Sequence, residues 1–217
     1  MGNTIHYRGR LAVPASLPDL IQTIQEAVRM LDWPYHLVDE RILGSAEILV
    51  YRPEAAEEEQ WGFETSPVDD RWRGIIVQPP GCESLWLTCN RSGQFIAYRT
   101  TALSYTTPGH YFAVDRLSTK TQGGGAETHI AVCDLLRLAV AHGAELEVID
   151  EGGYWETGDR EELERRLTLL DAAIDALASA LDEQEEDSEG LHVEVRPEIR
   201  RPLPDWRRDW GISAGEN

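Results

Sequence analysis

The N-terminal third of the chain alternates between the spacing of strands and the spacing of a helix. In residues 4–11 the apolar side chains occupy odd positions and the polar ones even positions, which predicts a strand with one solvated face. From Ser16 to Leu31 apolar residues recur every three or four positions, which predicts a helix with one face on a core. Residues 35–42 and 46–51 then predict two further strands.

A polar segment interrupts this pattern. Seven of the twenty residues in 52–71 are acidic and two are proline, so we expect a long surface loop there. A strand pattern resumes at 73–78. Residues 84–89 and 94–99 flank an Asn-Arg-Ser-Gly turn and predict a hairpin, and residues 110–118 predict one more strand.

The second half of the chain is mostly helical. Residues 126–142 are apolar on nearly all sides, which is typical of a buried helix. A short strand is expected at 145–150, followed by a helix at 160–181 whose leucines and isoleucine recur with heptad spacing. This order of elements predicts a single α+β domain, with a mixed, mainly antiparallel sheet packed against about three helices.

We expect the domain to span residues 1–181 and to be followed by an acidic linker at 182–190 and an extended tail at 191–217. Six of the first eight linker residues are acidic, whereas the tail is rich in arginine, tryptophan and proline. Arginine and tryptophan often anchor protein interfaces, so the tail is expected to dock on its own domain or on another protein. The expected contact residues are Arg200, Arg201, Trp206, Arg207, Arg208 and Trp210.

Composition narrows the function. The 217 residues include 39 acidic and 20 basic ones, for a formal charge of −19, which argues against direct contact with nucleic acid or anionic lipid. No apolar run is long enough to span a membrane, no signal peptide is evident, and three cysteines do not form a disulfide framework. We therefore expect a cytoplasmic, non-enzymatic protein without metal or cofactor. It would bind a protein partner, either basic or part of a larger complex, as an accessory, regulatory or immunity-type subunit.

Residues 118–129 contain a candidate anion site. Glycines between a strand and the start of a helix expose backbone N–H groups, and the only lysine of the chain, Lys120, precedes them. The segment lacks the Gly-Lys-Ser/Thr of a Walker A motif, and Glu127 in the first helical turn would repel an anion. A simple loop that leads into a buried helix is the alternative interpretation.

Residues 150–159 form a second candidate loop, with four carboxylates, two aromatic residues and three glycines. Carboxylates of this kind hold Mg²⁺ or Ca²⁺ or act in acid–base catalysis, although the spacing does not fit an EF-hand. Turn glycines, packed aromatic rings and a helix cap explain the same residues without a ligand. If both loops share one rim, the alternative to a protein-binding function is a small-ligand or enzyme pocket. Its residues would be Lys120, Gly123, Gly124, Gly125, Glu127, His129, Asp150, Glu151 and Glu156.

The same two loops also carry a resemblance. Residues 120–122, 127–130 and 150–159, with the opening residues 5–9, are similar to segments in a group of bacterial proteins for which no activity is known. The similarity covers roughly residues 4–181. It implies a bacterial α+β domain and transfers no catalytic residues.

Overall fold

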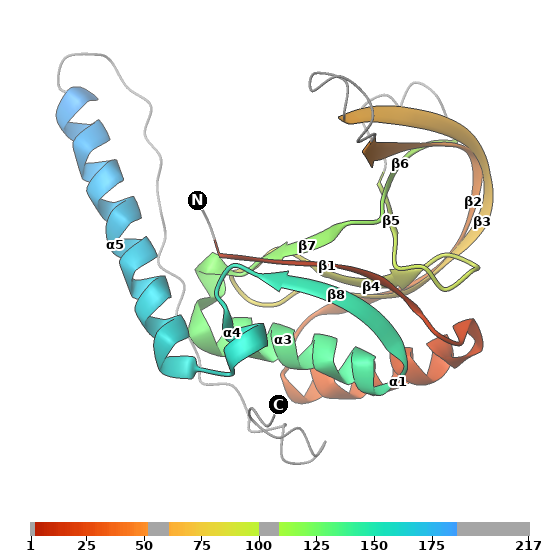
Figure 1. Ribbon diagram of the computed structural model, residues 1–217, viewed down its shortest axis with the longest axis horizontal. Helices are drawn as coiled ribbons and strands as arrows, with labels where there is room; N and C mark the ends of the chain where they lie inside the picture. Colours follow the sequence, from red (N-terminus) through yellow and green to blue (C-terminus); the bar gives the residue numbers. More distant parts are fainter. Residues whose placement is uncertain (1–2, 52–60, 100–108, 186–217) are drawn as a thin grey trace.

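The protein has an α+β fold, and its described residues form two mainly antiparallel sheets packed with four helices (Figure 1). The structure is a computed structural model, and it describes residues 3–51, 61–99 and 109–185. The expected fold class is therefore confirmed. The six expected tail contacts from Arg200 to Trp210 lie outside the described residues.

The smaller sheet holds the N-terminal strand at its centre. Its strands are β1 (Thr4–Leu11), β7 (Leu117–Lys120) and β8 (Ala144–Asp150), in the order β7-β1-β8, and both neighbours run antiparallel to β1. Because β7 and β8 end on either side of the start of β1, the two candidate loops that follow these strands begin at the same edge of the sheet.

The larger sheet is built on a long hairpin that curves over the smaller sheet in Figure 1. Its strands lie in the order β4-β3-β2-β6-β5, and the β2–β6 pair is parallel whereas the other pairs are antiparallel. The strands are β2 (Tyr35–Tyr51), β3 (Trp61–Val77), β4 (Leu85–Cys89), β5 (Ala97–Arg99) and β6 (His110–Val114).

The helices cover one side of both sheets. The helices are α1 (Leu17–Met30), α3 (Gly125–Ala141), the single turn α4 (Tyr154–Thr157) and α5 (Arg160–Glu185), and short 3₁₀ turns precede α1 and α3. The interior of α3, which includes Ile130 and Leu135, is fully buried, as its uniformly apolar sequence predicts. In Figure 1, α5 begins against α3 and α4 and then extends away from the body.

The predicted surface loop at 52–71 is wrong for its second half. Trp61–Arg71 belongs to β3, which pairs with β2 without interruption. Ion pairs across the hairpin accompany this pairing: Asp69 forms one with Arg41, and Arg71 forms one with Asp39 on the facing strand. Cross-strand ion pairs let a polar segment form a strand, and single-sequence periodicity does not show them.

Three other expectations need correction. The predicted strand at 110–118 is two strands in different sheets, and β5 pairs with β6 rather than completing a ladder with β4. One isolated bridge, Cys89 to Phe95, remains of the predicted hairpin. Helix α5 continues to Glu185, so the first residues of the expected linker at 182–190 are helical.

Candidate functional site

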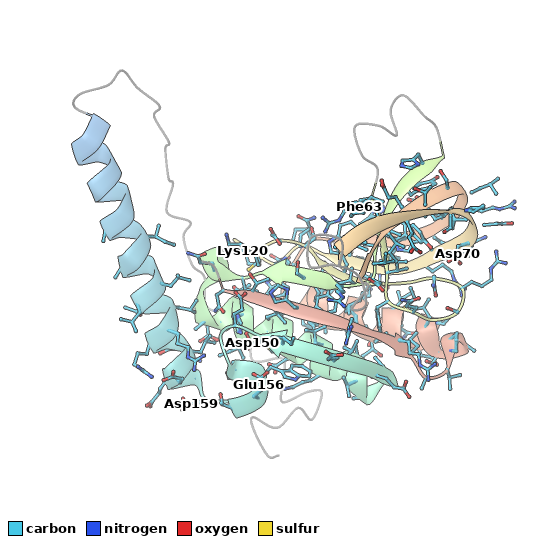
Figure 2. The ribbon with its side chains drawn as sticks, turned by 45° about the horizontal axis from the view of Figure 1, so that its top comes forward. Phe63, Asp70, Lys120, Asp150, Glu156 and Asp159 are labelled. Carbon is cyan, nitrogen blue, oxygen red and sulfur yellow. The ribbon has the colours of Figure 1, made fainter. Side chains whose placement is uncertain are left out.

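The two candidate loops meet at a buried pair of side chains, His129 and Asp150. His129 lies near the start of α3 and Asp150 at the end of β8, and Nε2 of the imidazole is 3.1 Å from Oδ2 of the carboxylate. Both side chains are completely inaccessible to solvent. Figure 2 shows Asp150 inside the layer between the smaller sheet and the helices.

The other nitrogen of His129 faces a hydroxyl group. Its Nδ1 is 2.7 Å from Oγ1 of Thr121, and that hydroxyl is 3.1 Å from the backbone carbonyl oxygen of Asn3. The hydroxyl is therefore within hydrogen-bond distance of both groups. The side-chain amide of Asn3 lies 3.5 Å from the same nitrogen.

The carboxylate of Asp150 accepts hydrogen bonds on both oxygens. The backbone N–H of Gly152 donates to Oδ1 at 2.7 Å, and that of Trp155 donates to Oδ2 at 2.9 Å. A carboxylate that accepts from these two backbone donors and from Nε2 of His129 is ionised. The arrangement is a buried, hydrogen-bonded His129–Asp150 pair that connects β1, β7, α3, β8 and α4.

The pKa of Asp150 follows from this environment. Burial by itself would raise the pKa, but the hydrogen bond and charge of His129 and the two backbone N–H donors together lower it below the ordinary value of 3.8. The pair therefore contributes most to stability when Asp150 is ionised.

A metal ion is the chemical alternative for this cluster. Ligand atoms of His129, Cys133 and Asp150 all lie within 4.8 Å of one another and are buried. Both nitrogens of His129 and both oxygens of Asp150 already have hydrogen-bond partners, however. Burial, together with the nearby charge of Asp150, raises the pKa of Cys133 well above its ordinary value, which keeps the group a thiol. These contacts fit a structural network better than a metal site.

The charged residues expected beside this pair make contacts of their own. Lys120 is exposed at the end of β7, and Glu127 forms an ion pair with Arg160 of α5. Glu151 accepts the backbone N–H of Thr4 at 3.0 Å and lies 3.3 Å from His6. Glu156 is exposed on α4.

The glycine loop packs against protein backbone. A Cβ on Gly123 would lie 2.5 Å from the carbonyl oxygen of Gly81, and one on Gly124 would lie 2.8 Å from that of Pro80. The close approach that glycine permits here is made to the turn at 79–82. Of the predicted site residues, the structure thus brings His129 and Asp150 into direct contact and assigns the glycines a packing role.

A surface that the sequence reasoning missed lies on the β2–β3 hairpin. Leu43, Leu49 and Phe63 are 56%, 42% and 54% exposed. They point to the same side of the sheet, because Leu49 is the direct cross-strand partner of Phe63 and Leu43 lies six residues before Leu49. Phe112 of β6 joins them, with its ring centroid 5.4 Å from that of Phe63. We call these four residues the outer hairpin face, and Figure 2 shows Phe63 on the curved larger sheet.

The opposite side of the same sheet has a packed aromatic cluster. Trp72 stacks on Trp86 with ring centroids 6.0 Å apart, and Tyr98 contacts both Trp72 and Tyr111 edge-on. The indole N–H of Trp72 donates to the carbonyl of Ile96, and the hydroxyl of Tyr98 donates to Asp70. The hairpin is therefore anchored by its inner side, and the outer hairpin face is not required for that packing.

The sequence contained one signal for this surface. Leu43 and Leu49 have the opposite parity to the buried Ile42 and Ala46, so β2 is apolar at both odd and even positions. Such a pattern is typical of a strand that is covered on both faces. In the described residues the outer side carries no covering element at Leu43, Leu49 or Phe63, which accounts for their exposure.

Comparisons of the chain with protein-family models, curated proteins and solved structures found no match. Within residues 3–51, 61–99 and 109–185, no helix combines the length and the apolar character needed to cross a membrane.

Proposed function

We propose that the protein is a non-enzymatic, acidic binding protein whose outer hairpin face contacts a basic protein partner. The observation that carries this proposal is the exposure of Leu49 and Phe63 side by side on the hairpin, with Leu43 exposed further along the same face of β2, on a sheet whose other side is already packed. Large apolar side chains grouped in this way typically mark an interaction surface.

The energetic argument concerns solvation. Burying one leucine or phenylalanine side chain is worth about 1.5–3 kcal/mol relative to full exposure. At the outer hairpin face roughly half of each side chain stays in water, so part of this free energy remains available to a partner. The edge-on pair of Phe63 and Phe112 also offers the aromatic surface that anchors many interfaces.

Charge indicates the kind of partner. Around the apolar residues lie Glu47 and the ion-paired Asp69 and Arg41, and the chain as a whole carries −19. The segment joining β2 to β3, residues 52–60, adds four glutamates in sequence. A partner with lysine and arginine around an apolar centre would complement this surface and would be attracted electrostatically. Such a role fits an accessory, regulatory or immunity-type subunit, with the arginine- and tryptophan-rich tail as a predicted second contact.

The test uses full-length protein with matched substitutions. Partners would be captured from the native host with the unchanged chain, with Leu43→Ser/Phe63→Ser, and with Val13→Ser, whose residue is 60% exposed outside the outer hairpin face. We expect a basic partner that the double variant loses and the control keeps. With purified partner, the double variant should raise Kd by roughly tenfold or more, and added salt should weaken the native complex.

Two outcomes would contradict the proposal. One is a partner that binds both variants with unchanged affinity, which would place the interface elsewhere. The other is self-association of the native chain that disappears in the double variant, which sedimentation would detect and which would make this face an interface between copies.

A further inference from the structure

A hollow beside α1 contains two arginines without an ion-pair partner. It has a volume of about 470 Å³ and is lined by α1 residues together with Arg73 of β3. Within the part of the chain that the structure describes, Arg29 and Arg73 form no salt bridge with a carboxylate. Among the described residues, the arginines that form ion pairs are Arg8, Arg10, Arg41, Arg71, Arg91, Arg137, Arg160, Arg165 and Arg166.

The guanidinium of Arg73 is the least satisfied of these groups. Its Nε is buried and has no hydrogen-bond partner among the described residues. The cross-strand neighbour Asp39 is bound to Arg71 at 2.5 Å rather than to Arg73. A buried donor without an acceptor costs about 1–3 kcal/mol, and more when the group is charged. An acceptor that enters the hollow would remove this cost.

The rest of the lining combines hydrogen-bond donors with an apolar floor. Gln25 and Arg29 both donate to the hydroxyl of Tyr35, at 2.8 and 3.1 Å. These hydrogen bonds, that of Gln25 first, lower the pKa of Tyr35 below its ordinary value. Leu17 and Ile21 contribute apolar surface to the same hollow.

One carboxylate also lines the hollow. Glu26 accepts the side-chain amide of Gln22 at 2.9 Å and forms no ion pair with Arg29 or Arg73. Two guanidinium groups against one carboxylate leave the lining with a formal charge of +1. A small positive hollow on a strongly negative protein is a local exception to the overall field.

We propose that this hollow binds a carboxylate attached to an apolar group, with Arg73 as the anchor. A planar guanidinium matches a carboxylate geometrically and binds it through two parallel hydrogen bonds. Leu17 and Ile21 would contact the apolar part of the ligand, and the volume lies within the range of small-molecule sites. The inference does not depend on the proposed protein-binding function, since the outer hairpin face uses other residues.

The experiment observes the arginine side chains directly. In ¹⁵N-labelled full-length protein, the Nε–H signals of Arg73 and Arg29 would be followed by NMR during titration with N-acetyl-leucine and, separately, with N-acetyl-leucine amide. We expect saturable shifts of both signals with the carboxylate and none with the neutral amide. Hexanoate, titrated in parallel, distinguishes a free aliphatic acid from a peptide C-terminus as the source of the carboxylate.

Matched variants decide whether Arg73 is the anchor. Arg73→Met should raise the Kd for N-acetyl-leucine by roughly tenfold or more, whereas Arg91→Met, at an exposed turn, should leave it unchanged. If Arg73→Met does not fold, Arg29→Met at an exposed position of α1 provides the same comparison, with a smaller rise. Equal shifts with the amide, or an unchanged Kd in the arginine variant that folds, would overturn the proposal.

Discussion

The buried His129–Asp150 pair and the outer hairpin face differ in what they leave unsatisfied. The pair contains the residue types of an active site, yet each of its polar atoms has a partner within the protein. The outer hairpin face contains ordinary leucines and phenylalanines, yet about half of each of three side chains is in contact with water. A ligand would therefore gain little binding free energy at the buried pair and more at the outer hairpin face.

This contrast shows why residue chemistry alone misleads. Histidine, aspartate and cysteine attract attention because they can catalyse reactions. Here these side chains are buried, and the hydrogen bonds of His129 and Asp150 connect five elements of the fold. Apolar residues in a strand are not singled out as candidate site residues, because most of them form cores. The free energy that a partner can gain depends on which polar groups already have hydrogen-bond partners and which apolar groups are already buried. The following substitutions and pH changes test this contrast between the two regions.

The largest effect is expected from removing one half of the buried His129–Asp150 pair. Asp150→Ala leaves Nε2 of His129 and two backbone N–H groups buried without an acceptor, so it should lower the free energy of unfolding by about 3–5 kcal/mol. Glu156→Ala, in the same acidic segment but exposed, should change it by less than about 0.5 kcal/mol. Urea denaturation of both variants measures the difference, and equal effects would show that the pair is not a structural element.

A smaller effect on the free energy of unfolding is expected when the pH is lowered. The pKa of Asp150 is lower in the folded than in the unfolded protein, so the unfolded chain takes up the proton first as the pH falls. The stabilisation is therefore complete above the ordinary pKa of 3.8 and is lost as the pH falls below it towards the folded pKa.

Comparison with an uncharged pair isolates this contribution. The double variant His129→Gln/Asp150→Asn has no titrating group at the site. The difference in unfolding free energy between the native chain and this variant should narrow as the pH falls below 3.8. A difference that stays constant or widens would be inconsistent with an ionised Asp150 in the folded state.

The smallest effect on stability is expected at the outer hairpin face. Phe63→Ser should lower the free energy of unfolding by about 1 kcal/mol, because roughly half of the side chain is already in water. Trp72→Ala on the packed side of the same hairpin should cost about 3–5 kcal/mol. Thermal or urea unfolding compares the two, and a large loss with Phe63→Ser would mean that this residue serves the fold rather than a partner.

Local pattern determined much of the fold. The alternation in residues 4–11, the helical spacing from Ser16 to Leu31 and the uniformly apolar segment 126–142 correspond within a residue to β1, α1 and α3. Each of these elements satisfies its backbone in a regular way and buries one face or all of itself, which periodicity in a single sequence reports. The two loops at 118–129 and 150–159 were likewise identified as special from their glycines and carboxylates.

Tertiary structure alone decided what these loops and strands do. Whether His129 faces Asp150 depends on the order β7-β1-β8, and whether Trp61–Arg71 forms a strand depends on the arginines across the hairpin. The exposure of Leu43 and Phe63 depends on how far α1 and the other helices reach along the curved sheet. These features arise from contacts between residues distant in the sequence, where the free energy of a side chain is set by its partners rather than by its neighbours along the chain.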